Sequence, residues 1–236
     1  MINYTNTAIV TFFDNKEKYI LAARRQKESL EVIGFPIENY FQFRNYEEIK
    51  SPSHGDIPYA FKPYAIQQIR NKGYETIIWM DSPVYAIKNL YELIYYINLN
   101  GFIFFDNLGY TISDYTSDIC LNNFNMSREE GFNKPMIMAC LMGFNFKNQL
   151  SIKLFNEYYQ AVNTYGNYEG DWTNEANQVS LDNRVKGHRH DQSVMSLILA
   201  KHNIKPIHPH STYFAYFGNP GHLPHAESVC LLSQGY

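Results

Sequence analysis

Cysteine is scarce in this chain, and long apolar runs are missing. The 236 residues include three cysteines at wide spacing, and this odd number favours neither a disulfide framework nor a zinc site. No apolar run reaches the length that spans a membrane, and no charged-then-apolar leader opens the chain. These features predict a protein of a reducing compartment, cytoplasmic and without a transmembrane segment.

An excess of positive charge is also lacking. The chain has 20 Lys and Arg against 23 Asp and Glu, which gives a formal net charge of -3. This balance argues against a nucleic acid or an anionic membrane as the main partner. Hydrophobic residues make up 45% and charged residues 18%, which is typical of a globular protein long enough to bury a core.

Aromatic residues are the abundant class. They make up 16% of the chain and include 20 tyrosines. A tyrosine combines an apolar ring with a polar tip, which suits pockets for sugars and nucleotide bases. A coding bias towards Tyr, Asn and Ile explains the same excess equally well.

The chain is organised around residues 76–80. These five mostly apolar residues, rich in β-branched and aromatic types, predict a strand buried on both faces. Asp81 follows directly, and an ionised carboxylate cannot stay unpaired inside a sheet. We therefore expect Asp81 at the carboxyl end of the strand, where open α/β sheets bind ligands. The alternative is that Asp81 only begins a turn or caps the next helix.

Strand-like and helix-like segments alternate along the chain. The predicted strands are residues 7–13, 41–46, 76–80, 101–105, 135–146 and 204–207. The predicted helices are residues 16–33, 60–72, 87–99, 113–123, 127–131, 148–162 and 193–200. The polar interval 165–186 is either a loop beside a site or a plain surface excursion. The alternation predicts an α/β fold with a mixed, mostly parallel central sheet and helices on both faces.

Three segments follow one another in a familiar order. They are KPYAI at 62–66 leading to IIWMD at 77–81, ACLMGFN at 139–145, and HDQSV at 190–194. They resemble the strand leading to the Asp-x-Asp motif, the strand flooring the sugar pocket and a late helix start in nucleotide-sugar glycosyltransferases of the GT-A fold. The resemblance implies a Rossmann-like nucleotide-binding sheet, a nucleotide-sugar donor and a glycan or small-sugar acceptor.

The resemblance also implies a set of site residues. The expected substrate-binding residues are Lys62, Asp81, Ser82, Gly143, His188, Arg189, His190 and Gln192. Asp191, at a helix start, is the expected catalytic base that takes the acceptor's proton, or else a plain helix N-cap. His188, Arg189 and His190 are expected to supply positive charge to the diphosphate, or to be solvent-facing loop residues.

The metal is where the sequence departs from the family pattern. Pro83 stands where the second Asp of Asp-x-Asp is expected, and proline offers no side-chain ligand. A divalent metal, Mn²⁺ or Mg²⁺, is still expected to bind together with the donor, held by Asp81 with His208 or His210. The alternative is that cationic side chains such as Lys62, Arg189 or a protonated histidine neutralise the diphosphate alone.

The predicted organisation is a single domain. Residues 1–135 would form a nucleotide-binding half, and residues 136–236 an acceptor and catalytic half. The predicted function is transfer of a hexosyl or related unit from a nucleotide sugar, as in polysaccharide biosynthesis. One alternative is a non-catalytic carbohydrate- or nucleotide-binding domain, which the missing second Asp favours. Another is a nucleotidyltransferase, which would need more acidic metal ligands.

Overall fold

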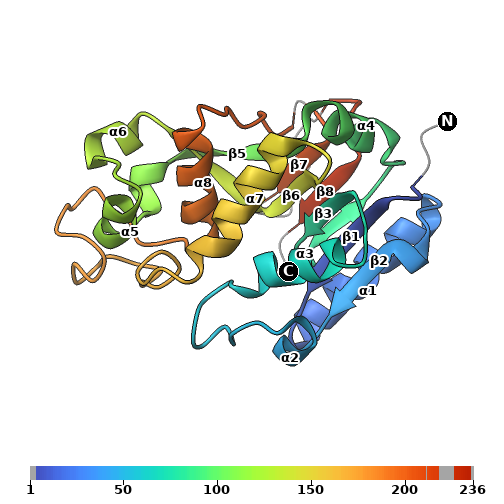
Figure 1. The fold of residues 1–236 in the computed structure, drawn as a ribbon, viewed down its shortest axis with the longest axis horizontal. Coiled ribbons are helices and arrows are strands. Elements are labelled where there is room, and N and C mark those ends of the chain that lie inside the picture. Colours follow the sequence, from blue (N-terminus) through green and yellow to red (C-terminus); the bar gives the residue numbers. More distant parts are fainter. Residues whose placement is uncertain (1–3, 211, 218–225, 235–236) are drawn as a thin grey trace.

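A five-stranded sheet forms the centre of the computed structural model, which describes residues 4–210, 212–217 and 226–234 (Figure 1). The strand order is β2-β1-β3-β6-β5. The strands are β1 (Thr7–Phe12), β2 (Tyr40–Phe43), β3 (Thr76–Met80), β5 (Phe102–Thr111) and β6 (Pro135–Asn145). β1 pairs in parallel with β2 and β3, whereas β6 is antiparallel to both β3 and β5. Only β6 of these strands therefore runs against the others, and the predicted mixed, mostly parallel sheet is confirmed.

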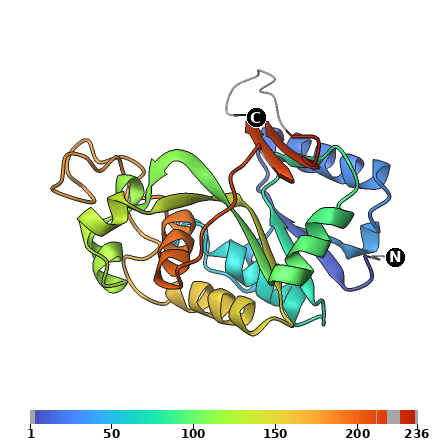
Figure 2. The same ribbon diagram turned by 90° about the horizontal axis from the view of Figure 1, so that it is seen from above.

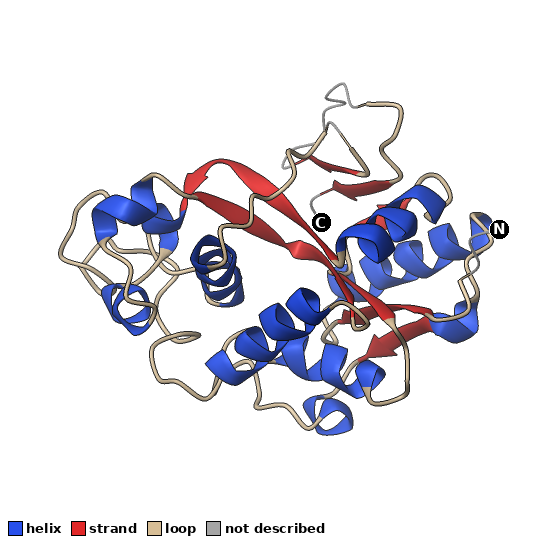
Figure 3. Cartoon of the chain, turned by 45° about the horizontal axis from the view of Figure 1, so that its top comes forward, coloured by secondary structure: helices blue, strands red, loops and turns tan. Residues whose placement is uncertain are grey.

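Helices cover both faces of this sheet (Figure 3). The α-helices are α1 (Glu17–Val32), α2 (Tyr46–Ile49), α3 (Phe61–Arg70), α4 (Tyr91–Asn100), α5 (Asp118–Asn123), α6 (Arg128–Phe132), α7 (Gln149–Ala161) and α8 (Asp191–Lys201), with 3-10 turns η1 (Ile37–Asn39) and η2 (Ile112–Tyr115). Side chains of α3, α7 and α8 pack in one core, and side chains of α1 and α4 pack in another. Within the described ranges, no helix has the length and apolar character needed to cross a bilayer.

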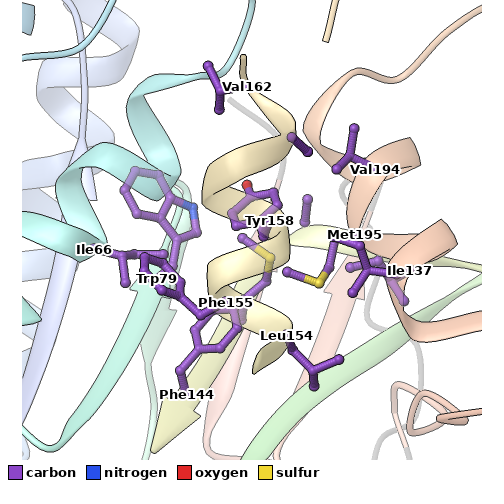
Figure 4. Packing of buried hydrophobic residues seen from close by; sticks show 14 of the residues in the cluster. Ile66, Trp79, Ile137, Phe144, Leu154, Phe155, Tyr158, Val162, Val194 and Met195 are labelled. Atoms are coloured by element: carbon purple, nitrogen blue, oxygen red, sulfur yellow. The ribbon is translucent and has the colours of Figure 1, made fainter. Parts of the chain in front are cut away.

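The central strand β3 is buried on both faces because its side chains alternate between the two cores. Ile77 and Trp79 belong to the core under α3, α7 and α8, whereas Ile78 and Met80 belong to the core under α1 and α4. Every residue of β3 is buried. Figure 4 shows part of the first core, in which side chains of α7 lie between Trp79 and the side chains of α8. The unbroken apolar run thus encodes a strand with no solvent face.

A second sheet of three short strands lies beside the first (Figure 2). Its order is β4 (Val84–Ala86), β8 (Leu231–Gln234) and β7 (Phe214–Phe217). β4 is antiparallel to β8, and β7 is parallel to it. Both predicted halves of the chain therefore contribute strands to each sheet, since β3 pairs with β6 and β4 pairs with β8.

Some predicted elements differ in the structure. Residues 204–207 form no strand; Ile207 makes an isolated bridge with Phe105, and Pro206 has no amide proton to extend a ladder. The helix expected from residue 87 begins at Tyr91, and the Ile87 amide donates to the Cys230 carbonyl at 2.9 Å instead. The helix expected over residues 127–131 forms as α6, and Ser127 caps it by accepting a hydrogen bond from the Glu130 amide at 3.2 Å. Most of the Gly/Pro/His-rich tail lies outside the described residues.

Candidate active site

Asp81 lies directly after the end of β3, as its place in the sequence predicts. Its amide donates to the Cys140 carbonyl at 2.8 Å, and its carboxylate accepts from the Trp79 indole Nε1–H at 2.7 Å. The Asp81 side chain is 29% exposed and lines a cavity of about 280 Å³. Other residues that line this cavity are Phe12, Asp14, Lys16, Tyr46, His54, Tyr59 and Ser82. The carboxyl end of the central strand therefore opens onto a cavity with aromatic and charged walls.

Lys62 joins two carboxylates beside this cavity. Its Nζ lies 3.2 Å from Asp81 Oδ1 and 2.9 Å from Asp191 Oδ2, and it donates to the Ala139 carbonyl at 2.9 Å. The side chains of Lys62 and Asp191 are only 3% and 4% exposed. We call Lys62, Asp81 and Asp191 the ion triad. It brings together α3, the end of β3 and the first residue of α8.

Burial and charge act in opposite directions within the ion triad. Burial alone would lower the pKa of Lys62, but the charges of Asp191 and Asp81 outweigh it and raise the pKa. Burial raises the pKa of Asp191 to about 6, although Lys62 opposes this rise. Lys62 therefore stays cationic, whereas Asp191 changes its protonation state close to neutral pH.

Three rings pack together next to Lys62, and two of them belong to residues with a positive φ. Tyr59 and His190 have φ values of 61° and 47°, and their rings stack with centroids 5.5 Å apart. The Trp172 ring lies 5.9 Å from Tyr59 and 5.4 Å from His190, and Lys62 Nζ is 5.3 Å from the Tyr59 ring. We call Tyr59, Trp172 and His190 the aromatic cover. A positive φ at a non-glycine residue costs about 1–3 kcal/mol and is concentrated at functional sites.

The two histidines before α8 do not have the charge expected of them. Both ring nitrogens of the fully buried His188 are used, because Nε2 lies 2.9 Å from the Asn167 carbonyl and Nδ1 accepts from the Ser117 amide at 3.2 Å. Burial lowers the pKa of His188 to about 3 and that of His190 to about 4. Both are therefore neutral at physiological pH in the ligand-free chain, and their contact with a substrate stays a prediction. His188 stabilises the loop after α7 through these two hydrogen bonds, and His190 belongs to the aromatic cover.

Gly143 serves close packing. A Cβ atom there would lie 2.7 Å from Ile97 Cδ1 and 2.9 Å from Ile103 Cγ2, so α4 approaches β6 closely at this point. This close approach explains the glycine without a substrate, and contact of Gly143 with a substrate stays a prediction. The segment 139–145 still contributes to the site through two backbone carbonyls. The Ala139 carbonyl accepts from Lys62 Nζ, and the Cys140 carbonyl accepts from the Asp81 backbone amide.

The remaining predicted substrate residues have different surroundings. Ser82 is buried and lines the same cavity as Asp81. Gln192 is half-buried in the first turn of α8, and its amide donates to the Arg189 carbonyl at 3.0 Å. The Arg189 guanidinium stacks on the Trp172 ring, 4.1 Å from its centroid. Contact of these three residues with a substrate stays a prediction.

The predicted metal ligands do not assemble. His208 is exposed and close enough to Asp106 to influence its pKa, and the His210 backbone pairs with Phe214 and Ala226. In the part of the chain that the structure describes, no three His, Cys, Asp or Glu side chains are grouped to hold a metal ion. The described residues thus contain no preformed site with three protein ligands. Binding of a metal by Asp81 with His208 or His210 and the donor phosphates stays a prediction.

Two contributions to the site were missed or set aside in the sequence. Trp79 is buried in the core, and it also orients the Asp81 carboxylate through its indole N–H. The signal was present, because residues two apart in a strand share one face. The pairing of Lys62 with Asp191 has no local signal, since the two residues lie on helices far apart in the chain.

Replacing Lys62 by Met is expected to lower the free energy of unfolding by about 2–3 kcal/mol. Two carboxylates would lose their shared cation in a buried place, and Asp191 can limit the loss by taking up a proton. Urea unfolding at pH 8 measures the effect. The control is Lys147→Met, because Lys147 is 68% exposed in its ion pair with Glu75 and its loss should barely shift the midpoint. Equal midpoints for both variants would contradict a stabilising triad.

Comparison with solved structures identifies the architecture. The apo structure of the bifunctional glycosyltransferase WbbM is 14% identical, with a TM-score of 0.54. The match covers 90% of this chain but 40% of the WbbM chain. A glycosyltransferase involved in the glycosylation of the major capsid of PBCV-1 is also 14% identical, with a TM-score of 0.53, over 96% of this chain and 93% of that one. The chain has a glycosyltransferase fold. No family model and no curated protein matches the sequence.

Proposed function

We propose that this chain transfers a sugar, a hexose or a related unit, from a nucleotide-sugar donor to a saccharide acceptor. The observation that carries the proposal is the Asp81 carboxylate, which opens onto a cavity at the end of the central strand and is joined through Lys62 to the carboxylate of Asp191. Ligands of open α/β sheets bind at this edge. The shared fold with two solved glycosyltransferases supports the class of reaction.

The cavity beside Asp81 has the groups that a nucleotide sugar needs. Phe12, Tyr46 and Tyr59 offer ring surfaces to a base or a ribose. Asp81 Oδ1 accepts from the Trp79 indole, and Oδ2 accepts a long 3.5 Å hydrogen bond from Lys62 Nζ. A carboxylate oxygen has two lone pairs, so Oδ2 can still accept from the donor. Lys16 lines the cavity with a 68% exposed side chain and can turn from Asp14 to a diphosphate. No step of the proposal needs a metal ion.

Asp191 is the proposed proton acceptor. In a single displacement, the acceptor hydroxyl attacks the anomeric carbon, its proton passes to a carboxylate, and the nucleoside diphosphate leaves with the bonding electrons. A carboxyl with a pKa of about 6 is ionised at neutral pH and still basic enough to take that proton. Asp191 is paired with Lys62, whose Nζ lies 5.3 Å from the Tyr59 ring, so the Tyr59 side chain must move when the acceptor reaches Asp191.

A thermal-shift panel of UDP-, GDP- and dTDP-sugars tests the proposed donor. We expect one nucleotide series to raise Tm, because a ligand at about 100 times its Kd stabilises the native state by about 2.7 kcal/mol. The shift should persist in EDTA, since the described residues bring no three ligand side chains together. A shift that appears only with Mn²⁺ would mean that Asp81 and the donor hold an ion between them.

Turnover separates an enzyme from a binding domain. With donor and a mixture of saccharides, we expect release of the nucleoside diphosphate, which a coupled assay measures. No thermal shift with any nucleotide sugar would contradict the proposed function. A shift without release, with water and with every saccharide tried, would favour a non-catalytic nucleotide-sugar-binding domain.

A further inference from the structure

A row of aromatic and basic side chains continues from the aromatic cover. The Arg189 guanidinium lies between two rings, 4.1 Å from the Trp172 centroid and 4.3 Å from the Tyr115 centroid. Tyr115 and Tyr110 meet edge to face at 5.1 Å, and Lys186 Nζ lies 5.1 Å from the Tyr110 ring. We call these five residues the stacked strip. It joins the loop after α7, coloured orange in Figure 1, to the end of β5 and to η2.

The strip is accessible and leads to the Asp81 cavity. Trp172 is 47% exposed and Tyr110 is 38% exposed. At one end Trp172 contacts Tyr59, which lines the cavity. Near the other end lies Tyr216 of β7, 40% exposed, whose pKa is raised by burial and by the nearby Cys140, Asp81 and Tyr110. A ligand lying along the strip would therefore reach the proposed site of transfer.

The backbone holds the strip in place before any ligand binds. Gly187 has a φ of +154°, and a Cβ atom there would lie 1.9 Å from the Trp172 carbonyl oxygen, so only glycine permits this approach. The same carbonyl accepts from Arg189 Nη1 at 3.1 Å. The Arg189 amide donates to the Tyr115 carbonyl at 3.1 Å, and the Lys186 amide to the Asp114 carbonyl at 2.7 Å. Preorganisation of this kind lowers the cost of binding.

The two cations of the strip differ in their partners. Lys186 is paired with Asp114, whose carboxylate lies 2.9 Å away. Arg189 forms no ion pair with any carboxylate of residues 4–210, 212–217 and 226–234, and its guanidinium donates to a backbone carbonyl. The strip therefore carries one positive charge without a counterion, on the group whose planar fork best matches a carboxylate or a phosphate.

We propose that the stacked strip is the acceptor site, and that the acceptor is a saccharide carrying an anionic group, a carboxylate or a phosphate, which Arg189 binds. The rings of Trp172 and Tyr110 would pack against the sugar rings, as aromatic side chains line binding sites. The Arg189 edge not used by the Trp172 carbonyl would hold the anion. This inference rests on the proposed function and adds the chemical class of its acceptor.

The test compares charged and neutral saccharides on the full chain without donor. The probes are a disaccharide with a glucuronic acid unit and its neutral glucose counterpart, and glucose 6-phosphate and glucose. Binding is measured by calorimetry and by quenching of Trp172 fluorescence, since the other of the two tryptophans, Trp79, is fully buried. Arg189→Gln is compared with Arg184→Gln, an arginine of the same loop that pairs with Glu129 and Asp182.

At least one anionic probe should bind the wild-type chain and Arg184→Gln equally, and Arg189→Gln about tenfold or more weakly, because a charge-assisted hydrogen bond is lost. The affinity for the neutral probes should not change with either substitution. Binding of the glucuronic acid probe would indicate that the anion is a carboxylate, and binding of glucose 6-phosphate would indicate a phosphate. The inference is overturned if no probe binds, if charged and neutral probes bind alike, or if Arg189→Gln changes nothing.

Thermal shifts with the nucleotide sugars, measured on the same variants, distinguish a failure of the proposed acceptor site from a failure of the proposed transfer function. Donor thermal shifts that are unchanged in Arg189→Gln, together with lost binding of the anionic probe, support a separate acceptor site. Lost donor binding in Arg189→Gln would overturn it, because Arg189 would then belong to the donor site. If no nucleotide sugar binds the wild-type chain, the transfer function fails, whereas the saccharide measurements still decide whether the strip binds an anionic sugar.

Discussion

Replacing Asp81 by Asn is expected to weaken donor binding or turnover by about 10²-fold or more while the fold stays intact. The carboxylate is the charged group of the ion triad with an exposed edge, and it faces the cavity beside the central strand. Asparagine keeps an oxygen for the Trp79 indole, and Lys62 keeps Asp191 at 2.9 Å. Stability should therefore change little, and the loss should be confined to the ligand.

Donor thermal shift and nucleoside diphosphate release measure this effect. Asp106→Asn is the matched control, because Asp106 is also half-buried and follows an apolar run of strand residues, but does not line the cavity. We expect the control to bind the donor like the wild-type chain. An Asp81→Asn protein with wild-type affinity and rate would restore the interpretation of Asp81 as a turn residue.

Replacing Asp191 by Asn is expected to lower turnover by about 10²-fold or more without lowering Tm. The sequence allowed Asp191 to be a helix N-cap, but the N-cap of α8 is His190, and Asp191 is paired with Lys62. The pKa of Asp191 is raised from 3.8 to about 6, so the folded state prefers the protonated carboxyl. Its stabilising contribution is full below pH 3.8 and is lost as the pH rises through about 6. Asparagine resembles the protonated form and avoids this loss.

Two pH profiles check the assignment. The wild-type rate should fall as the pH decreases through about 6, because Asp191 accepts a proton only when ionised. The Tm of Asp191→Asn should equal that of the wild-type chain near pH 4 and match or exceed it at pH 8. A rate that survives the substitution places the base elsewhere, with Asp171 and Asp182 as the next candidates. A rate and a Tm that fall together would mean that Asp191 is structural.

Much of the fold follows from local patterns. The apolar run 76–80 predicted the central strand with the bounds of β3, because a strand without a polar face can only lie between two layers. Helical periodicity likewise predicted α1, α3 and α7 to within a few residues. The short strands β4 and β8 were not predicted, since each is stabilised by a partner distant in sequence and has no periodic pattern of its own.

The site divides in the same way. The sequence by itself determined that Asp81 stands at the carboxyl end of a fully buried strand and that Asp191 begins a helix. Both conclusions follow from patterns of apolar residues that are close together in the chain. Only the tertiary structure decided which charges meet and which groups keep a charge at all. Lys62 binds both carboxylates, His188 and His190 are buried and neutral, and Arg189 lies between two rings. These outcomes depend on how α3, α8 and the loop after α7 pack together, and no local pattern encodes the solvation and the distances that this packing creates.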